Sequence, residues 1–300
     1  GAYRWLVMLM AMVATICAVL SATIINVAIP DIMGSFGIEQ VDAQWLAAGF
    51  LAATTTTMVL VDYASKMVGQ KPLMVAALTT FLLASLMGGF AEETHTLIAS
   101  RIIQGAAAGF MQPLSMIAVF QVFPPEQRGR AMGVYGLGAV LSPALGPYFG
   151  GFLVEALSWR YVFFVGVPLA SLGIALTLAF MPTPERKGPR PTFDFPAFVL
   201  LVTFLVCVLT AFTDGPRDGW NDTSVVIRFV VGSLSAVGFV VWEKHAPNPM
   251  LDVSIYTRPA FAGATIVNIM LGAGLFGSTY MLPLFVQTIQ GLTPTLAGAI

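Results

Sequence analysis

The sequence has 300 residues, of which 57% are hydrophobic and only 10% are charged. An ordinary soluble domain carries roughly 25% charged residues, so this composition is typical of a membrane protein. The net charge of −1 is uninformative as a sum. We expect the lipid bilayer as the environment of the chain and no nucleic acid as a partner.

Nine segments are apolar over about 20 residues, the length that a helix needs to cross a hydrocarbon core of ~30 Å. They cover residues 5–29, 43–61, 73–90, 96–121, 131–154, 161–181, 196–213, 224–242 and 261–288. So many spans exclude a single-helix anchor and a soluble enzyme with a signal peptide. Because the strands of a membrane barrel would alternate over about ten residues, these runs predict an all-α polytopic membrane protein.

The basic residues predict the orientation of these spans. With a cytoplasmic N-terminus, ten lysines and arginines lie in inner loops or at inner helix ends, and two lie in outer loops. The positive-inside rule therefore predicts a cytoplasmic N-terminus. The remaining two basic residues, Arg101 and Arg228, fall within spans.

The longest polar connection is the stretch "PTPERKGPRPTFDF" (182–195), with four prolines and three basic residues after the sixth span. It is the best domain boundary, and a cytoplasmic linker in the predicted orientation. The last ten residues, "GLTPTLAGAI", resemble a loop and the first turn of a tenth apolar helix, so we expect an incomplete chain.

A polar stripe follows the fourth span, where a charge at the helix centre costs about 2.5–3.5 kcal/mol on insertion scales. It consists of Arg101, Gln104, Gln112 and Ser115, spaced by helical multiples on one face. We expect Arg101 to be a buried charge that organises the contact of this helix with the first or the fifth, and the two glutamines to line a pathway. The alternative is an arginine that reaches the outer surface while the glutamines join neighbouring helices.

The fifth span contains residues that break soluble helices. Its small residues Gly138, Ser142, Gly146 and Gly150 are four apart. Such a face allows another backbone to approach closely. On a different side, Pro143 and Pro147 each remove a helix hydrogen bond, which lipid tolerates only where neighbours replace it. The pattern predicts a kinked helix that is packed tightly against a partner.

The ninth span carries a second polar side, formed by Thr265, Asn268, Gly272, Thr279 and Gln287. We expect the two polar stripes to face a common cavity, with Asn26 as a further candidate for its lining. The run of four threonines at residues 54–57 is explained by bonding of each hydroxyl to the preceding turn, and we expect no functional role for it.

Several motifs carry a family resemblance. The stretch "LIASRIIQGAAAGF" (97–110) resembles the fourth-helix motif of the major facilitator superfamily, with Arg101, Gln104 and Gly105 in the motif places. The stretch "GLGAVLSPALGPYFGG" (136–151), which ends at Gly151, is similar to the fifth-helix motif of its antiporter branches. "TIINVAIPDI" (23–32) and "WRYVFFVGVP" (159–168) resemble segments of the fourteen-helix drug:proton antiporters of the EmrB/QacA type, as does the stretch with "DGW", "NPMLD" and "MLPLFVQ".

This resemblance implies a major facilitator fold with two extra helices between two six-helix bundles. The N-terminal bundle would cover 1–181, the linker 182–195, the inserted pair 196–243, and the start of an incomplete second bundle 244–300. It also implies proton-coupled export of small amphipathic or cationic drugs by alternating access, with no cofactor and the proton gradient as the energy source. A periplasmic adaptor and an outer-membrane channel are possible partners.

The chain departs from the family pattern in two places. Ser21 stands where the first helix commonly has an acid, and the loop "DYASKMVGQK" (62–71) keeps Gly69 and Lys71 but has Asp62 and Lys66 in altered places. Asp62 and Lys66 lie one turn apart, which predicts a local pair worth a few tenths of a kcal/mol. We expect this loop to take part in gating.

Two alternatives remain from the sequence. The protein could export one specific metabolite, or be a scaffold or degenerate remnant that transports nothing. An enzyme is disfavoured because the sequence has no nucleotide loop, nucleophile–base set or metal-ligand cluster. Cys17 and Cys207 lie in spans and are expected to be packing residues. The proton carrier stays open, since each acid lies in a loop or at a helix end, with Asp62 and Glu243 nearest to membrane depth.

Overall fold

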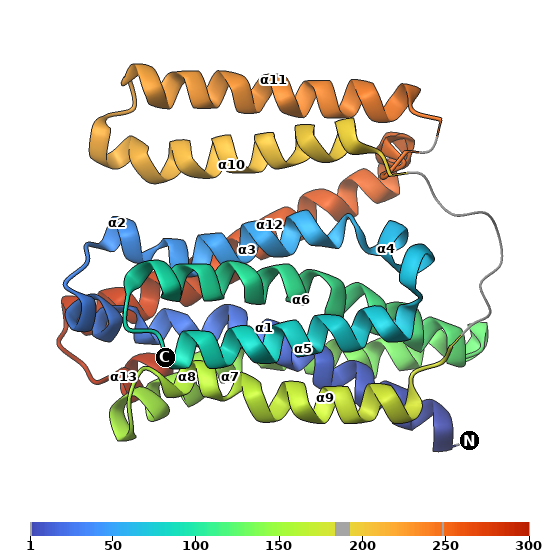
Figure 1. Cartoon of the computed structure of the whole chain (residues 1–300), viewed down its shortest axis with the longest axis horizontal. Coiled ribbons are helices and arrows are strands. Elements are labelled where there is room, and N and C mark those ends of the chain that lie inside the picture. The colour runs from blue at the N-terminus through green and yellow to red at the C-terminus, as the bar shows by residue number, and fades with distance from the viewer. Residues whose placement is uncertain (1, 184–192, 248, 300) are drawn as a thin grey trace. The chain divides into compact units, whose positions relative to one another are not determined.

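The computed structural model describes residues 2–183, 193–247 and 249–299, and all regular structure in these residues is helical (Figure 1). The helices are α1 (Ala2–Phe36), α2 (Gln40–Ala43), α3 (Trp45–Met58), α4 (Val61–Val68), α5 (Gln70–Gly89), α6 (Thr94–Val122), α7 (Pro125–Ala156), α8 (Tyr161–Phe164), α9 (Gly166–Phe180), α10 (Phe195–Asp218), α11 (Thr223–His245), the 3₁₀ helix η1 (Val253–Thr257), α12 (Pro259–Thr288) and α13 (Pro294–Ala299). The expected all-α fold is confirmed.

Eight helical segments of the described residues are long and apolar enough to cross a membrane, and a bent pair brings the number to as many as nine. The bent pair lies at the second predicted span, 43–61. It consists of Gln40–Met58 and Val61–Val68, which meet at 59°. Asp62 and Lys66 are charged and exposed on the second segment, and charged side chains are costly in hydrocarbon, so α4 leaves the direction of α3.

The chain divides into two compact units. The first comprises Gly1–Gly188 and Ser278–Ile300, and the second comprises Pro189–Gly277. The last turns of α12 and all of α13 therefore belong with the first unit. Most of the expected linker, residues 184–192, lies outside the described residues. The four-part domain division expected from the sequence stays a prediction.

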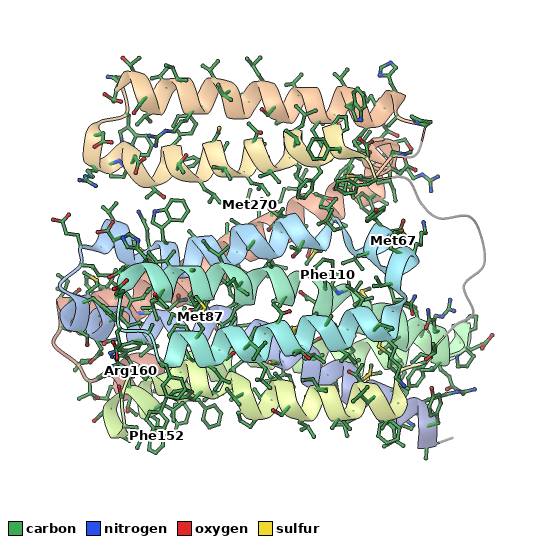
Figure 2. All side chains as sticks on the ribbon, in the orientation of Figure 1. Met67, Met87, Phe110, Phe152, Arg160 and Met270 are labelled. Carbon is green, nitrogen blue, oxygen red and sulfur yellow. The ribbon has the colours of Figure 1, made fainter. Side chains whose placement is uncertain are left out.

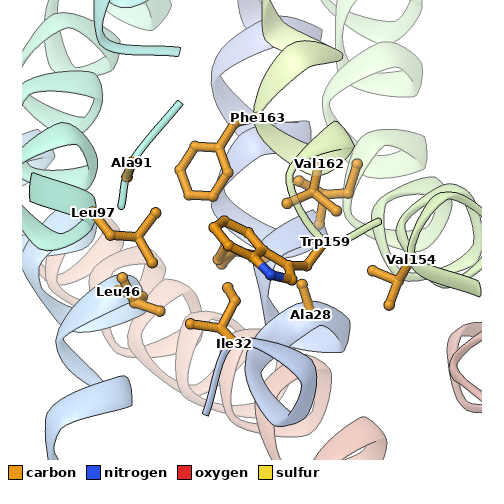
Figure 3. Close-up of a cluster of buried hydrophobic side chains, with 11 residues drawn as sticks. Ala28, Ile32, Leu46, Ala91, Leu97, Val154, Trp159, Val162 and Phe163 are labelled. Carbon is orange, nitrogen blue, oxygen red and sulfur yellow. The ribbon is translucent and has the colours of Figure 1, made fainter. Parts of the chain in front are cut away.

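The first unit is built around α1, in which 78% of the most apolar 18-residue window is buried. Its N-terminal end is marked by Tyr3, whose hydroxyl donates to the carbonyl of Phe180 at 3.0 Å. At the opposite end a buried apolar cluster closes the bundle (Figure 3). Its members are Ile24, Ile25, Ala28, Ile32, Leu46, Ala91, Leu97, Val154, Trp159, Val162 and Phe163.

Two polar contacts hold the chain around this cluster. The indole N–H of Trp159 donates to the hydroxyl of Ser35 at 3.1 Å, and the guanidinium of Arg160 donates to the carbonyl of Ala91 at 3.2 Å. The connection between α7 and α8 is thereby tied to the ends of α1 and α5. The bundle is well packed at the end opposite to its N-terminus.

The second unit contains the antiparallel pair α10 and α11. An ion pair joins Asp214 of α10 to Arg228 of α11. Gly232 allows the two helices to approach, since a Cβ there would lie 2.9 Å from a methyl carbon of Val208. The Asp222 carboxylate caps α11 and accepts hydrogen bonds from the hydroxyl and N–H of Ser224, which lower its pKa.

The outward surface of the long helices is apolar, as a helix facing lipid requires. Figure 2 shows Phe152 of α7 at the outer surface of the first unit, where it is 55% exposed, and Met270 of α12 is 69% exposed. Several dozen large hydrophobic side chains are exposed in the same way. This surface and the apolar spans identify a multi-pass membrane protein.

Candidate transport site

Arg101 is the largest fully buried side chain of the described residues, with 1% of its surface exposed. Its Nε donates to the carbonyl of Leu46 at 2.8 Å, and its Nη1 donates to Oε1 of Gln104 at 2.9 Å. The guanidinium carbon lies 4.2 Å from the centre of the Phe50 ring, close enough for a cation–π interaction. The charge is therefore held by a carbonyl, an amide and an aromatic face.

These contacts correct the expected partner of Arg101, which was the first or the fifth helix. Leu46 and Phe50 both belong to α3, the second span. A backbone carbonyl has two lone pairs, so Leu46 can accept from the guanidinium in addition to its helical hydrogen bond. Spacing along α6 indicates which side of that helix is polar, but it does not indicate which neighbour lies there.

Gln104 extends the network to a third helix. Its amide nitrogen donates to Oγ of Ser85 in α5 at 2.8 Å, and the Ser85 hydroxyl in turn donates to the carbonyl of Phe81. Gln104 is 1% exposed and Ser85 is fully buried. The amide therefore lies inside the packing of α5 against α6, where the sequence suggested a pathway lining.

The contact of α6 with α3 depends on two glycines. A Cβ on Gly105 would lie 2.8 Å from the Cα of Phe50, and one on Gly109 would overlap the carbonyl of Thr54. The Thr54 hydroxyl bonds to the carbonyls of both Phe50 and Gly105, at 2.8 and 3.0 Å. At Gly105 the two backbones are in direct contact, and at Gly109 the Thr57 hydroxyl and the Thr54 carbonyl lie closest.

The threonine run consequently does more than the sequence suggested. The hydroxyls of Thr54, Thr55, Thr56 and Thr57 each donate to the carbonyl four residues earlier, as expected. Thr54 also bridges to α6, which was missed. The glycine spacing in "GAAAG" (105–109) was the signal that could have found this interface.

The rest of the stripe on α6 is less tightly bonded. Ser115 is fully buried, and its hydroxyl has no hydrogen-bond partner among the described residues. Gln112 is half-buried, and its backbone carbonyl faces the hydroxyl of Tyr135 at 3.4 Å. The same Tyr135 hydroxyl lies 2.6 Å from that of Thr15, so α1, α6 and α7 meet at this point.

The small residues of α7 face α1. A Cβ on Gly138 would lie 2.9 Å from the methyl carbon of Met12, and one on Gly150 would lie 2.8 Å from the carbonyl oxygen of Ile24. Gly146 lies against Thr23 in the same way. Ser142 is buried, and its hydroxyl donates to the carbonyl of Gly138 at 2.6 Å. One face of α7 is thus pressed against α1 over three turns.

A second face of α7 meets α13. Gly151 lies against the backbone of Pro294, and Gly298 lies against the backbone of Pro147, so each helix offers a glycine to the other. Pro143 and Pro147 are buried inside a helix that stays continuous from Pro125 to Ala156. The expected kink at these prolines stays a prediction. The helix lies between α1 and α13.

The segment expected as a loop after the second span is instead helix α4 and the start of α5, and two contacts hold it. Nζ of Lys66 lies 2.6 Å from Oδ2 of Asp62, so the predicted local pair is present, with both side chains largely exposed. Gly69 connects α4 to α5 with φ 94°, in the region that favours glycine. Lys71 then donates from Nζ to the carbonyl of Leu178 at 2.6 Å, close to the end of α9.

The remaining candidates belong to α1 and α12. Asn26 in α1 is 3% exposed, and its Oδ1 has no partner among the described residues. Asn268 is exposed on α12 and donates from its amide to the carbonyl of Ala264 at 2.9 Å, whereas Thr279 is half-buried. Gln287, at the end of α12, donates to the carbonyl of Val27 at 3.1 Å. Within the described ranges, no group of three His, Cys, Asp or Glu side chains could hold a metal ion.

The sequence matches the family model described as Major Facilitator Superfamily over residues 11–300. It is 30% identical to the methylenomycin A resistance protein of Streptomyces coelicolor, over 94% of this chain and 59% of that protein. It is 29% identical to the multidrug export protein EmrB of Haemophilus influenzae, over 95% of this chain and 56% of that protein. The chain thus spans little more than half the length of these relatives, which are export or resistance proteins rather than enzymes.

Solved structures share the fold. A peptide transporter POT in complex with sulfate matches with a TM-score of 0.68 at 12% identity, over 98% of this chain and 64% of that one. The inward-open xylose transporter XylE from E. coli matches with a TM-score of 0.56 at 11% identity, over 99% of this chain and 94% of that one. At such identities the likeness concerns the fold alone.

Proposed function

Since the chain belongs to the major facilitator superfamily, we propose that it is part of a proton-coupled exporter of amphipathic or cationic compounds. The multidrug and antibiotic-resistance relatives support this substrate class. The apolar spans also support it, because a mostly apolar pocket with few polar groups suits substrates of varied shape. Asn26 and Ser115 have buried polar atoms without partners and are our candidates for contacts with substrate.

Alternating access is the transport mechanism that we propose. It requires two packed arrangements of the same helices. The observation that carries the proposal is the position of α7, which presents glycines to α1 on one face and to α13 on another. The α13 contacts are with backbone atoms and the α1 contacts are partly with side chains, and we propose that this close packing limits leakage. We propose that Pro143, Gly146, Pro147 and Gly150 form the bend at which this closure is made and released.

We propose that Arg101 organises the interior of the bundle during the cycle. It joins α3 and α6 directly and reaches α5 through Gln104. A buried cation without a neighbouring carboxylate responds strongly to any charge that approaches it. Arg101 takes part in none of the described ion pairs. We therefore propose that its hydrogen bonds respond to the charge of a bound proton or of a cationic substrate.

We propose a cytoplasmic N-terminus in a bacterial inner membrane, which the distribution of basic residues supports. Docking to a periplasmic adaptor and an outer-membrane channel is a further proposal that rests on the family resemblance. Labelling of single cysteines by an impermeant reagent in intact cells would test the orientation. Labelling of the Gln127→Cys variant from outside the cell would contradict the proposed orientation.

The export function can be tested in proteoliposomes that hold the full-length protein. We expect ethidium to move when a pH gradient is imposed and to stop when an ionophore removes the gradient. Arg101→Ala should abolish this flux while expression continues, and the exposed Arg217→Ala serves as the matched control. Binding of the dye without gradient-dependent flux would support a scaffold instead, and normal flux in Arg101→Ala would refute the role given to this residue.

A further inference from the structure

A groove runs along the outside of the first unit between α5 and α9. It is open along its outer side, has a volume of about 650 Å³ and is lined by Lys71, Pro72, Val75, Ala76, Thr79, Thr80, Leu178 and Thr183. The α5 residues that follow Pro72 in this lining lie three, four, seven and eight positions after it, so they share one helix face with it. The groove therefore follows about two turns of α5 along the direction of the spans.

The wall of this groove is apolar over most of its length. Val75, Ala76 and Leu178 offer only hydrocarbon, and the Thr79 hydroxyl is occupied by a hydrogen bond to the carbonyl of Val75 at 2.8 Å. A satisfied hydroxyl presents mainly its methyl group to a neighbour. This part of the groove suits a hydrocarbon chain.

Lys71 gives the groove a positive end. Its ammonium donates one of three hydrogens to the carbonyl of Leu178 at 2.6 Å, which fixes the charge beside the last turn of α9. Within the described residues, no carboxylate lies in ion-pair distance of Lys71. Two hydrogens are therefore available for an oxygen ligand. Because Lys71 belongs to the first turn of α5, this end of the groove is at the boundary of the span.

We propose that this groove is a binding site for one anionic phospholipid, with its phosphate at Lys71 and one acyl chain along α5 and α9. Basic pockets between membrane helices bind such headgroups, and a lysine near the surface is worth about 1 kcal/mol toward an anionic lipid. That is a preference of about fivefold. The site is separate from the Arg101 network and does not depend on the proposed export.

Native mass spectrometry of the full-length protein would test this site without any transport substrate. The protein is mixed with phosphatidylglycerol or with phosphatidylcholine at equal concentration, and the bound lipid is counted. We expect retention of phosphatidylglycerol over phosphatidylcholine by about fivefold. Equal retention of the two lipids would overturn the proposal, because the groove would then be a place for any acyl chain.

Variants separate the charge from the groove. Lys71→Gln should remove the preference, and Lys71→Arg should keep it, since the arginine also donates to phosphate. Lys66→Gln is the matched control, because Lys66 has the same charge but lies outside the groove. An unchanged preference in Lys71→Gln, or an equal loss in Lys66→Gln, would refute the assignment.

A second pair of variants tests the apolar part. Ala76→Phe fills the groove without a change of charge and should lower the retention of phosphatidylglycerol severalfold. Ala175→Phe places the same bulk on an exposed position of α9 outside the groove and should leave it unchanged. If both variants retain lipid as the wild type does, the acyl chain does not occupy this groove. Ethidium efflux in the same variants reports on the export function independently.

Discussion

The six-span bundle and the α10–α11 pair are both made of apolar helices, but they are held together differently. In the bundle, 78% of the most apolar window of α1 is buried, against 17% for α10 and 22% for α11. The bundle has contacts between backbones, as at Gly105 and Phe50. The pair depends on side chains, which are the Asp214–Arg228 ion pair and the aromatic contact of Phe212 with Phe229.

The two regions should therefore differ in how much stability a substitution costs. Lipid tails are as apolar as leucine, so helices in a membrane gain little from burying apolar side chains against one another. Close backbone approach and hydrogen bonds must supply the specificity. Substitutions in the bundle should therefore cost more than substitutions in the pair, and four predictions test this ordering.

The largest effect is expected at the glycine contact. Gly105→Ala places a methyl group against the backbone of Phe50, and such overpacking costs up to about 3 kcal/mol. Gly136→Ala is the matched control, because no heavy atom lies within 4 Å of its Cβ position. Thermal unfolding of the purified protein measures both. Equal melting temperatures would mean that the helices separate here at little cost.

The buried polar network should come next. Gln104→Leu leaves Nη1 of Arg101 without its acceptor, and an unsatisfied buried group of this kind costs about 1–3 kcal/mol. The half-buried Gln112→Leu in the same helix should have a smaller effect. Chemical unfolding would separate the two variants. A larger loss in Gln112→Leu would show that the network contributes less than the outer part of the stripe.

The α10–α11 pair should show a smaller coupling. Asp214 and Arg228 are about one-third exposed, and ion pairs of this kind contribute about 1 kcal/mol or less. A double-mutant cycle with Asp214→Asn and Arg228→Gln would measure the coupling energy from thermal unfolding. A coupling above that of the Arg101–Gln104 pair would reverse the proposed ordering of the two regions.

The smallest effect is expected at the exposed Asp62–Lys66 pair of α4. The swap Asp62→Lys with Lys66→Asp keeps opposite charges one turn apart and should change the free energy of unfolding by a few tenths of a kcal/mol. Ethidium efflux should continue in the swapped variant. Loss of efflux with unchanged stability would show that one of these charges has a partner beyond the local pair.

The sequence predicted the features that depend on local spacing. The number of spans, the Asp62–Lys66 pair and the small-residue face of α7 all follow from the distance between residues along one helix. The helix α4 was missed, because the sequence placed Asp62 and Lys66 in a loop after the apolar run. Hydropathy alone does not register a change of direction.

The partners of Arg101 could not be predicted for a different reason. Its acceptor at Leu46 is a backbone carbonyl, and every residue has one, so no residue type marks the contact. Which helix supplies it depends on the order of the helices around the bundle. The same applies to Thr54, whose bridge to Gly105 appears only when α3 and α6 are placed side by side.

The contact of Gly105 and Gly109 with α3 also limits how the bundle can move. At Gly105 backbone meets backbone, with no side chain between them that could adjust, so we expect α3 and α6 to move together as one rigid unit. The flexing must then fall to the short junctions on either side, at the 59° bend after Met58 and at the connection from Phe90 to Glu93. We expect the hinges for any rocking of α3 and α6 at these two junctions.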